Sequence, residues 1–147
     1  MRAGASGNGD VSREPGRDGG EYILLIDDEE PILDVLVALL RDDEGYEVYT
    51  ARSGEEALHV APPAVPGLIL MDLSLPDGDP KDVAQSLRSR PGWQDVALVI
   101  CSGADRLREE ADRLGATDCL PKPFGLTDVT DLVERLGLPR RRRRDDI

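Results

Sequence analysis

The chain has few of the features that mark exported and membrane-spanning proteins. Its 147 residues contain no apolar run of about 18 residues, so no segment is expected to cross a membrane. The N-terminus has no apolar stretch of the kind that a signal peptide needs. Two cysteines, Cys101 and Cys119, are too few for a disulfide framework. These absences predict a cytoplasmic protein without a membrane partner.

Basic residues are scarce in the body of the chain. Residues 21–138 hold 10 Lys and Arg against 25 Asp and Glu, a net charge of −15, whereas the whole chain carries −12. So acidic a surface repels phosphate backbones, and we expect the body to bind no nucleic acid. The one basic run, Arg140–Arg144, could contact nucleic acid, an anionic membrane or an acidic partner. We favour a solvated tail that binds nothing.

The composition divides the chain into three parts. Residues 1–20 are rich in Gly, Arg, Asp and Ser and almost free of apolar residues, which predicts a disordered leader. Residues 21–138 are long enough for one domain with its own core. Residues 139–147 form an Arg-rich tail. About ten residues follow the last expected helix, so we expect no attached output domain.

Apolar runs and helical stripes alternate along residues 21–138. Short apolar runs predict strands, and stripes with helical spacing predict a helix after each of them. Ser53 and Glu56 have the spacing of a capping box at the start of the second helix. Alternating strands and helices favour an α/β fold with a parallel sheet covered on both faces. The expected strands are residues 22–26, 47–51, 67–71, 96–101 and 117–120.

Polar residues follow the expected strands where they end. Asp27 and Asp28 follow the first strand, Asp72 the third, Ser102 the fourth and Lys122 the fifth. In such sheets the ligand site lies beyond the carboxyl ends of the strands, so these side chains are expected to converge. Carboxylates placed together repel unless a cation is present, and Mg²⁺ prefers oxygen ligands. A carboxylate can also act as a nucleophile and form an aspartyl phosphate.

Each residue taken alone has a simpler explanation. A carboxylate at a strand end can cap the next helix, and a single lysine or serine there can be a surface residue. The convergence favours a site in which Asp72 accepts a phosphoryl group. Lys122 and Ser102 would then contact the charge of that group.

Four segments carry a resemblance to a known family. They are ILLIDDEEPI, LILMDLSLPDGD, LVICSGAD and ATDCLPKPF, in this order and each at a strand end. Together they resemble the receiver domain of bacterial two-component response regulators over about residues 21–138. The resemblance implies a flavodoxin-like (βα)5 doubly wound three-layer sandwich, with a five-stranded parallel sheet in the order 2-1-3-4-5.

The resemblance also implies a metal site. Asp72 would be the phosphoacceptor and a metal ligand, and Asp28 would bind Mg²⁺ directly. Asp27 would bind the ion mainly through water, and the backbone carbonyl of Ser74 would complete the site. Mn²⁺ is the alternative ion.

The remaining roles implied by the family concern the phosphoryl group and the switch. Lys122 would pair with the phosphoryl group, Ser102 would be the switch hydroxyl, and the bond before Pro123 would be cis. The family usually has Tyr or Phe three residues before the lysine, where this chain has Cys119. This departure leaves the phosphorylation chemistry untouched and puts the usual output of the switch in question.

With the short segment after the last expected helix, the resemblance predicts a single-domain response regulator, a diffusible phospho-switch or phosphorelay intermediate that catalyses only its own phosphorylation and dephosphorylation. Its partners would be a histidine kinase or phosphotransfer protein and an unknown downstream protein, and the chain itself would be a monomer or weak dimer. One alternative is a receiver-like adaptor that works without phosphate, which Cys119 favours. The other is a Mg-dependent phosphatase of the haloacid dehalogenase type. Those enzymes usually have a general-acid Asp where Ser74 stands, which disfavours this alternative.

Two further residue types have competing interpretations. Cys101 and Cys119 are expected near the ends of neighbouring strands, as a redox-sensitive pair or, as we favour, as two small buried hydrophobes. His59 has no second ligand nearby and is expected at the surface.

Overall fold

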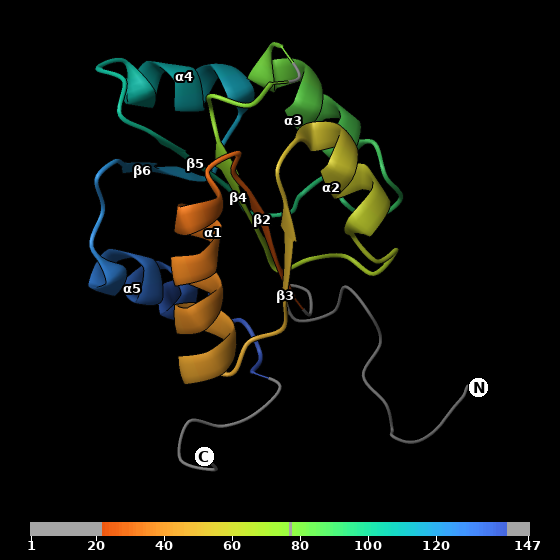
Figure 1. The fold of residues 1–147 in the computed structure, drawn as a ribbon. Coiled ribbons are helices and arrows are strands. Elements are labelled where there is room, and N and C mark those ends of the chain that lie inside the picture. Colours follow the sequence, from red (N-terminus) through yellow and green to blue (C-terminus); the bar gives the residue numbers. More distant parts are fainter. Residues whose placement is uncertain (1–21, 77, 141–147) are drawn as a thin grey trace, which may run out of the picture.

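Five parallel strands form the centre of the computed structural model, which describes residues 22–76 and 78–140 (Figure 1). Each strand is paired in parallel with its neighbours, in the order β3-β2-β4-β5-β6. Counted along the chain this is 2-1-3-4-5, which confirms the expected topology. The strands are β2 (Ile23–Ile26), β3 (Val48–Ala51), β4 (Leu68–Asp72), β5 (Leu98–Ser102) and β6 (Asp118–Pro121).

The three central strands are buried along their whole length because helices cover both faces of the sheet. Every residue of β2, β4 and β5 is buried, whereas β3 and β6, at the two edges, are partly exposed. Side chains alternate between the faces, so each strand contributes to two separate cores. In β2, Leu24 and Ile26 belong to one core and Ile23 and Leu25 to the other.

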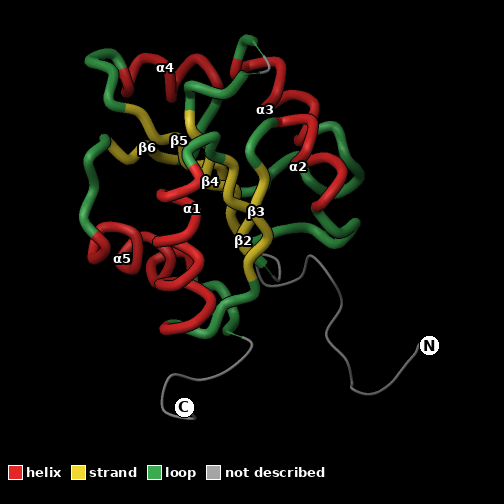
Figure 2. Tube along the Cα trace, viewed as in Figure 1, coloured by secondary structure: helices red, strands yellow, loops and turns green. Residues whose placement is uncertain are grey.

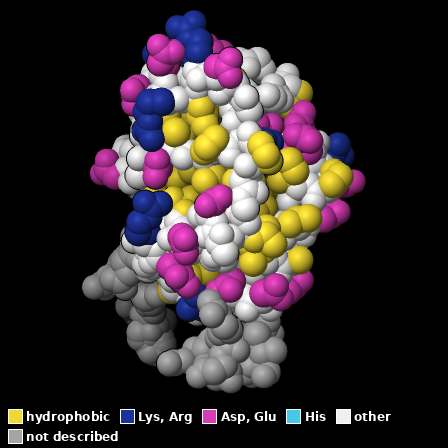
Figure 3. Space-filling view, turned by 90° about the vertical axis from the view of Figure 1, so that its left-hand side faces the viewer, with side chains coloured by type: hydrophobic (Ala, Val, Ile, Leu, Met, Phe, Trp, Pro, Cys, Tyr) yellow, Lys and Arg dark blue, Asp and Glu magenta, His cyan; other side chains and the backbone are white. Residues whose placement is uncertain are grey.

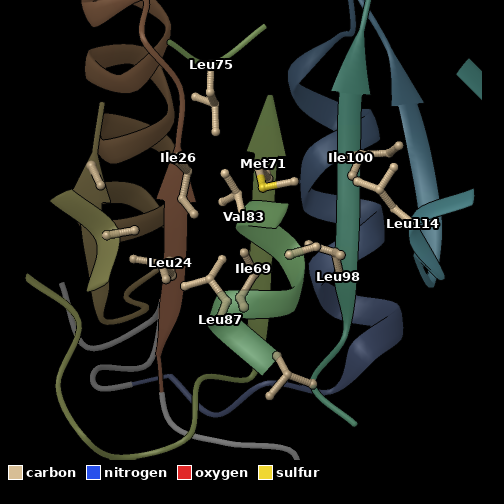
Figure 4. Close-up of a cluster of buried hydrophobic side chains, with 14 of the residues drawn as sticks. Leu24, Ile26, Ile69, Met71, Leu75, Val83, Leu87, Leu98, Ile100 and Leu114 are labelled. Carbon is tan, nitrogen blue, oxygen red and sulfur yellow. The ribbon is translucent and has the colours of Figure 1, made fainter. Parts of the chain in front are cut away.

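The helices complete a three-layer arrangement (Figures 1 and 2). Side chains of α2, α3 and α4 pack into one core, and those of α1 and α5 into the other. Figure 4 shows the first core, where Val83 and Leu87 of α3 lie over Ile69 and Met71 of β4. The helices are α1 (Glu30–Val37), α2 (Gly54–Val60), α3 (Pro80–Arg88), α4 (Leu107–Leu114) and α5 (Leu126–Leu136).

The observed helices differ from the sequence prediction at two of their ends. The α1 helix continues as a π-helical segment, η2 (Ala38–Asp43), which the periodicity did not predict. At α2, Ser53 Oγ accepts the hydrogen bond of the Glu56 N–H at 3.0 Å, as expected. The Glu56 carboxylate, however, accepts from the N–H of Arg52, not from that of Ser53, so the capping box closes one residue earlier than predicted.

The C-terminal end of the described chain is attached to the body. The guanidinium of Arg140 lies 5.0 Å from the ring centre of Tyr46 and 3.1 Å from Glu44. Its side chain is only 29% exposed, so the expectation of a solvated tail is wrong for this first residue of the basic run. The leader and Arg141–Arg144 lie outside the described residues. No helix in the described ranges is long and apolar enough to span a bilayer.

Candidate functional site

Strand register brings the polar residues to one edge of the sheet. Ile26, Met71 and Ile100 lie side by side on β2, β4 and β5. The residue after each therefore lies at the same carboxyl edge, which places Asp27 beside Asp72. Ser102 ends β5, and Lys122 directly follows β6. The predicted convergence of strand ends is thus present.

Lys122 is the positive centre of this edge. Its Nζ lies 3.1 Å from Oδ2 of Asp27 and 3.4 Å from Oδ1 of Asp72, and a third carboxylate, that of Glu29, is also 3.4 Å away. Burial alone would lower the pKa of Lys122, but the hydrogen bond and charge of Asp27, with the charge of Asp72, raise it above its ordinary value. The lysine therefore stays protonated and holds the carboxylates together.

Asp72 is the most deeply buried acid of this edge. Its side chain is 3% exposed, and its Oδ2 has no hydrogen-bond partner among the described residues. Burial and the charge of Asp27 raise the pKa of Asp72, while Lys122 and the backbone N–H of Ser74 act in the opposite direction. A buried oxygen without a partner is costly, so this atom is positioned to bind a ligand.

Four carboxylates form an acidic cluster around Asp72. Asp27, Asp28, Glu29 and Asp72 each place one oxygen so that all four lie within 4.8 Å of one another. Such oxygen donors suit a hard divalent ion, and Mg²⁺ binds with few carboxylates and retained waters. The unpartnered Oδ2 of Asp72 is the second sign that the cluster fits a cation.

The sequence prediction missed Glu29. The available signal is a third acid directly after Asp27 and Asp28 in the sequence. The structure shows that its backbone N–H donates to Oδ1 of Asp27 at 2.9 Å, which holds the residue at the rim of the cluster.

Two serines of the predicted site flank Asp72. Ser102 is buried, and its Oγ accepts the hydrogen bond of the Ala104 N–H at 3.0 Å. Ser74 is exposed in the loop after β4. The peptide bond between Lys122 and Pro123 is cis.

Comparison with known proteins identifies the family. Residues 23–134 match the response regulator receiver domain. The chain belongs to this family. It is 34% identical over 114 residues to PhoP, the alkaline phosphatase synthesis transcriptional regulatory protein of Bacillus subtilis, a match that covers 78% of this chain and 47% of PhoP. It is also 34% identical over 125 residues to the KDP operon transcriptional regulatory protein KdpE of Escherichia coli, covering 82% of this chain and 51% of KdpE. The receiver therefore spans about half the length of these curated relatives.

Solved receivers share the fold. The chemotaxis response regulator CheY4 of Vibrio cholerae superposes with a TM-score of 0.70 at 26% identity, covering 79% of this chain and 98% of that one. The non-phosphorylated receiver domain of HemR from Leptospira biflexa has a TM-score of 0.68 at 30% identity, covering 82% and 97%. The predicted flavodoxin-like fold and the predicted family are both confirmed.

The two cysteines of this receiver do not form a pair. In the register of β5 and β6, Cys119 lies opposite Ile100, and Cys101 lies opposite Leu120. Cys101 packs into the core beneath α1 and α5, whereas Cys119 packs into the core beneath α4. Their side chains thus point to opposite faces of the sheet, because adjacent positions alternate, and the idea of a redox-sensitive pair is wrong.

A groove opens next to the acidic cluster. It has a volume of about 530 Å³ and runs between α1 and the segment that leads from Lys122 into α5. Val35 and Leu126, both on its walls, are about half exposed. Figure 3, a view from the side of α4, β6 and α5, shows hydrophobic side chains gathered on this side among acidic and basic ones. The groove is lined by Glu29, Pro31, Ile32, Val35, Leu36, Lys122, Pro123, Phe124 and Leu126.

Proposed function

We propose that this receiver accepts a phosphoryl group on Asp72 from the phosphohistidine of a histidine kinase or phosphotransfer protein. The observation that carries the proposal is the state of Asp72. It is a buried carboxylate with one oxygen unpartnered within the described chain, at the carboxyl edge of the sheet and 3.4 Å from the Lys122 ammonium. A carboxylate so placed is a nucleophile with a fixed direction of approach.

The chemistry uses groups that are already in place. An Asp72 oxygen attacks phosphorus, the phosphorus–nitrogen bond breaks, and its electron pair leaves on the imidazole nitrogen. The product is an acyl phosphate, whose added negative charge needs cationic and hydrogen-bonding partners. Lys122 can turn from Asp27 toward the phosphoryl oxygens, and the Ser102 hydroxyl at the end of β5 can donate to one of them.

A divalent ion completes the proposed site. Asp28, Asp72 and the Ser74 backbone carbonyl would hold Mg²⁺, with Mn²⁺ as the alternative, and Asp27 would reach it through water. When bound, the ion offsets the negative charge that the phosphoryl group brings to the cluster.

The groove beside the cluster suits the phosphate donor. A protein-bound phosphohistidine reaches Asp72 only if the protein that carries it lies against the rim of the site. The groove begins at Glu29 and Lys122 and continues along α1 past exposed Val35. We infer that the donor places an apolar surface there, with basic residues facing the acidic rim.

Phosphoryl transfer is tested by incubation with acetyl phosphate and Mg²⁺, followed by intact mass measurement. We expect one phosphoryl group on the wild-type chain and none on Asp72→Asn. Asp112→Asn, which makes the same change at an exposed position of α4, should label like wild type. Equal labelling of wild type and Asp72→Asn would contradict the proposal, as would steady turnover of a phosphate ester.

Cys119 favours a second candidate, a receiver that signals without phosphate. The half-buried thiol at this position cannot undergo the ring movement of an aromatic switch. Binding of a partner that is unchanged by Asp72→Asn and by acetyl phosphate would support this candidate.

A further inference from the structure

We propose that Glu29 is a movable fourth carboxylate of the cation pocket, held beside it by Lys122 and able to turn to a bound ion. The inference deepens the proposed function, because it adds a residue to the same site. It stands on three properties of Glu29: its fixed backbone, its exposed side chain and its distance from both the lysine and the other acids.

The backbone of Glu29 is fixed by the site itself. Its N–H donates to Oδ1 of Asp27, and its carbonyl accepts hydrogen bonds from the first turn of α1. The side chain, by contrast, is 58% exposed. A long side chain on a fixed backbone can exchange partners at small cost.

The carboxylate of Glu29 is not used to cap its helix. Glu29 is the N-cap residue of α1, but its side chain makes no capping hydrogen bond. The N-cap residue of α3, Asp79, behaves differently, since its carboxylate accepts the hydrogen bond of the Lys81 N–H. Glu29 instead directs its Oε2 toward Lys122, at 3.4 Å.

The charges around Lys122 explain why Glu29 would change partner. One ammonium group faces the carboxylates of Asp27, Glu29 and Asp72. Asp28 adds a fourth acid, with one oxygen within 4.8 Å of an oxygen of each of the other three. Four carboxylates exceed what one lysine neutralises, and Asp72 Oδ2 is buried without a hydrogen-bond partner in the described chain. A divalent ion at that atom would attract every oxygen of the cluster, and Glu29 is the member with the most freedom to follow.

The test measures cation binding without any phosphate donor. Mn²⁺ is titrated into the wild-type chain and into Glu29→Gln, with the electron paramagnetic resonance signal of free Mn²⁺ as the readout, and Mg²⁺ is measured by competition. Removing the charge of a carboxylate that turns to the divalent ion is expected to weaken binding roughly threefold to tenfold at low salt. The difference should shrink as salt is raised.

Glu30→Gln is the matched control. Glu30 is the next residue along the chain, is exposed and lies outside the cluster, so it removes the same charge without removing a ligand. We expect less than about a twofold change for this variant. Equal weakening by Glu29→Gln and Glu30→Gln, or no weakening by Glu29→Gln, overturns the inference.

A separate measurement distinguishes failure of the inference from failure of the proposed function. If acetyl phosphate labels wild type but not Asp72→Asn while the two variants bind Mn²⁺ equally, Glu29 has no special role and Asp72 is still the phosphoacceptor. If labelling fails while Glu29→Gln alone weakens Mn²⁺ binding, the cation pocket includes Glu29 and the phosphorylation proposal is wrong.

Discussion

Lys122 Nζ lies 3.1 Å from Oδ2 of Asp27, closer than its 3.4 Å from Oδ1 of Asp72. In this structure the lysine is therefore first of all the counter-ion of the acidic pair. Two acids, 3% and 8% exposed at their side chains, depend on one cation that is itself only 17% exposed. Removal of the lysine would therefore leave two buried carboxylates without a cation.

Lys122→Met should destabilise the fold in the absence of divalent ions. Removing one partner of a buried ion pair leaves an uncompensated charge, and here it leaves two. The expected loss is about 3 kcal/mol in the free energy of unfolding, measured by urea denaturation in EDTA. Arg108→Met is the control, because Arg108 pairs with Asp118 but is 63% exposed, and less than about 0.5 kcal/mol is expected. Equal losses for the two variants would contradict the role given to Lys122.

Asp72→Asn should stabilise the fold in EDTA, and the gain should depend on pH. Burial and the charge of Asp27 raise the pKa of Asp72 above its ordinary value of 3.8, so the folded state disfavours the charged form. Below pH 3.8 the Asp72 carboxyl is protonated in both the folded and the unfolded state, so folding buries no charge there. As the pH rises through the folded pKa, wild type loses stability relative to Asp72→Asn, and the difference then levels off.

Urea denaturation of both proteins across the acid and neutral range measures this difference. Asp112→Asn should show none of the pH dependence, because Asp112 is exposed. Saturating Mg²⁺ should reverse the order at neutral pH, since it stabilises only the protein with the intact cluster. A difference that is the same at every pH would show that the Asp72 charge is not its cause.

The sequence was sufficient to predict the sheet and to group most of the site residues, because both depend on local patterns. Apolar runs that stop at Asp27 or Asp72 define buried parallel strands and their ends. Parallel pairing then brings all those ends to one edge, so Asp27, Asp72, Ser102 and Lys122 could be grouped without coordinates. The roles of these residues in phosphoryl transfer stay predictions until they are tested.

Features that depend on side-chain reach could not be predicted in this way. Arg140 packs on Tyr46, which lies 94 positions earlier, and no periodic signal links them. Glu29 directs its carboxylate toward Lys122 and makes no capping hydrogen bond to α1, although the helix dipole favours an acid at a helix start. Cys101 lies opposite Leu120, one position away from Cys119, so the two thiols point to opposite faces of the sheet. The sequence alone does not determine this strand register.

The two thiols should differ in reactivity by a large factor. Burial raises the pKa of Cys101 to about 12, and the residue lies in the core beneath α1 and α5. Cys119 is partly exposed on the edge strand β6. With a thiol-specific alkylating reagent at neutral pH, we expect one fast modification, lost in Cys119→Ser, and a second only on unfolding. Rapid modification of Cys101 in the native state, or an intramolecular disulfide under mild oxidation, would contradict the structure.

Arg140→Ala should destabilise the fold although it lies near the end of the described chain. Its guanidinium stacks over Tyr46 and pairs with Glu44 and Glu134, linking the segment after η2 to α5. We expect a loss of about 1 kcal/mol in the free energy of unfolding, mostly from the stacking and the Glu44 pair. Arg140→Lys should recover less than half of it, because an ammonium lacks the flat surface of guanidinium. A loss below about 0.3 kcal/mol for Arg140→Ala would mean that this contact does not hold in solution.

Gly54→Ala should destabilise the protein even though alanine is the better helix former. Gly54 begins α2, and a Cβ at this position would lie 2.7 Å from Cγ1 and 2.9 Å from Cγ2 of Val83 in α3. Such overlap in a packed core lowers the free energy of unfolding by about 1 to 3 kcal/mol. This loss exceeds the roughly 1 kcal/mol gained because alanine has a higher helix propensity than glycine. Because the clash is with one side chain, Val83→Ala should relieve it. We therefore expect the double variant to lose less than the sum of the two single losses.

Gly103→Ala is the matched control for this contact. A Cβ there would meet only the carbonyl oxygen of Lys122 at 3.8 Å, an ordinary van der Waals distance. The change should alter the free energy of unfolding by less than about 0.5 kcal/mol. Strictly additive losses for Gly54→Ala and Val83→Ala would mean that α2 and α3 do not approach as closely as the structure shows. Sub-additive losses would place the closest contact of the added methyl group at the interface of α2 and α3, on the face of the sheet away from α1 and its groove.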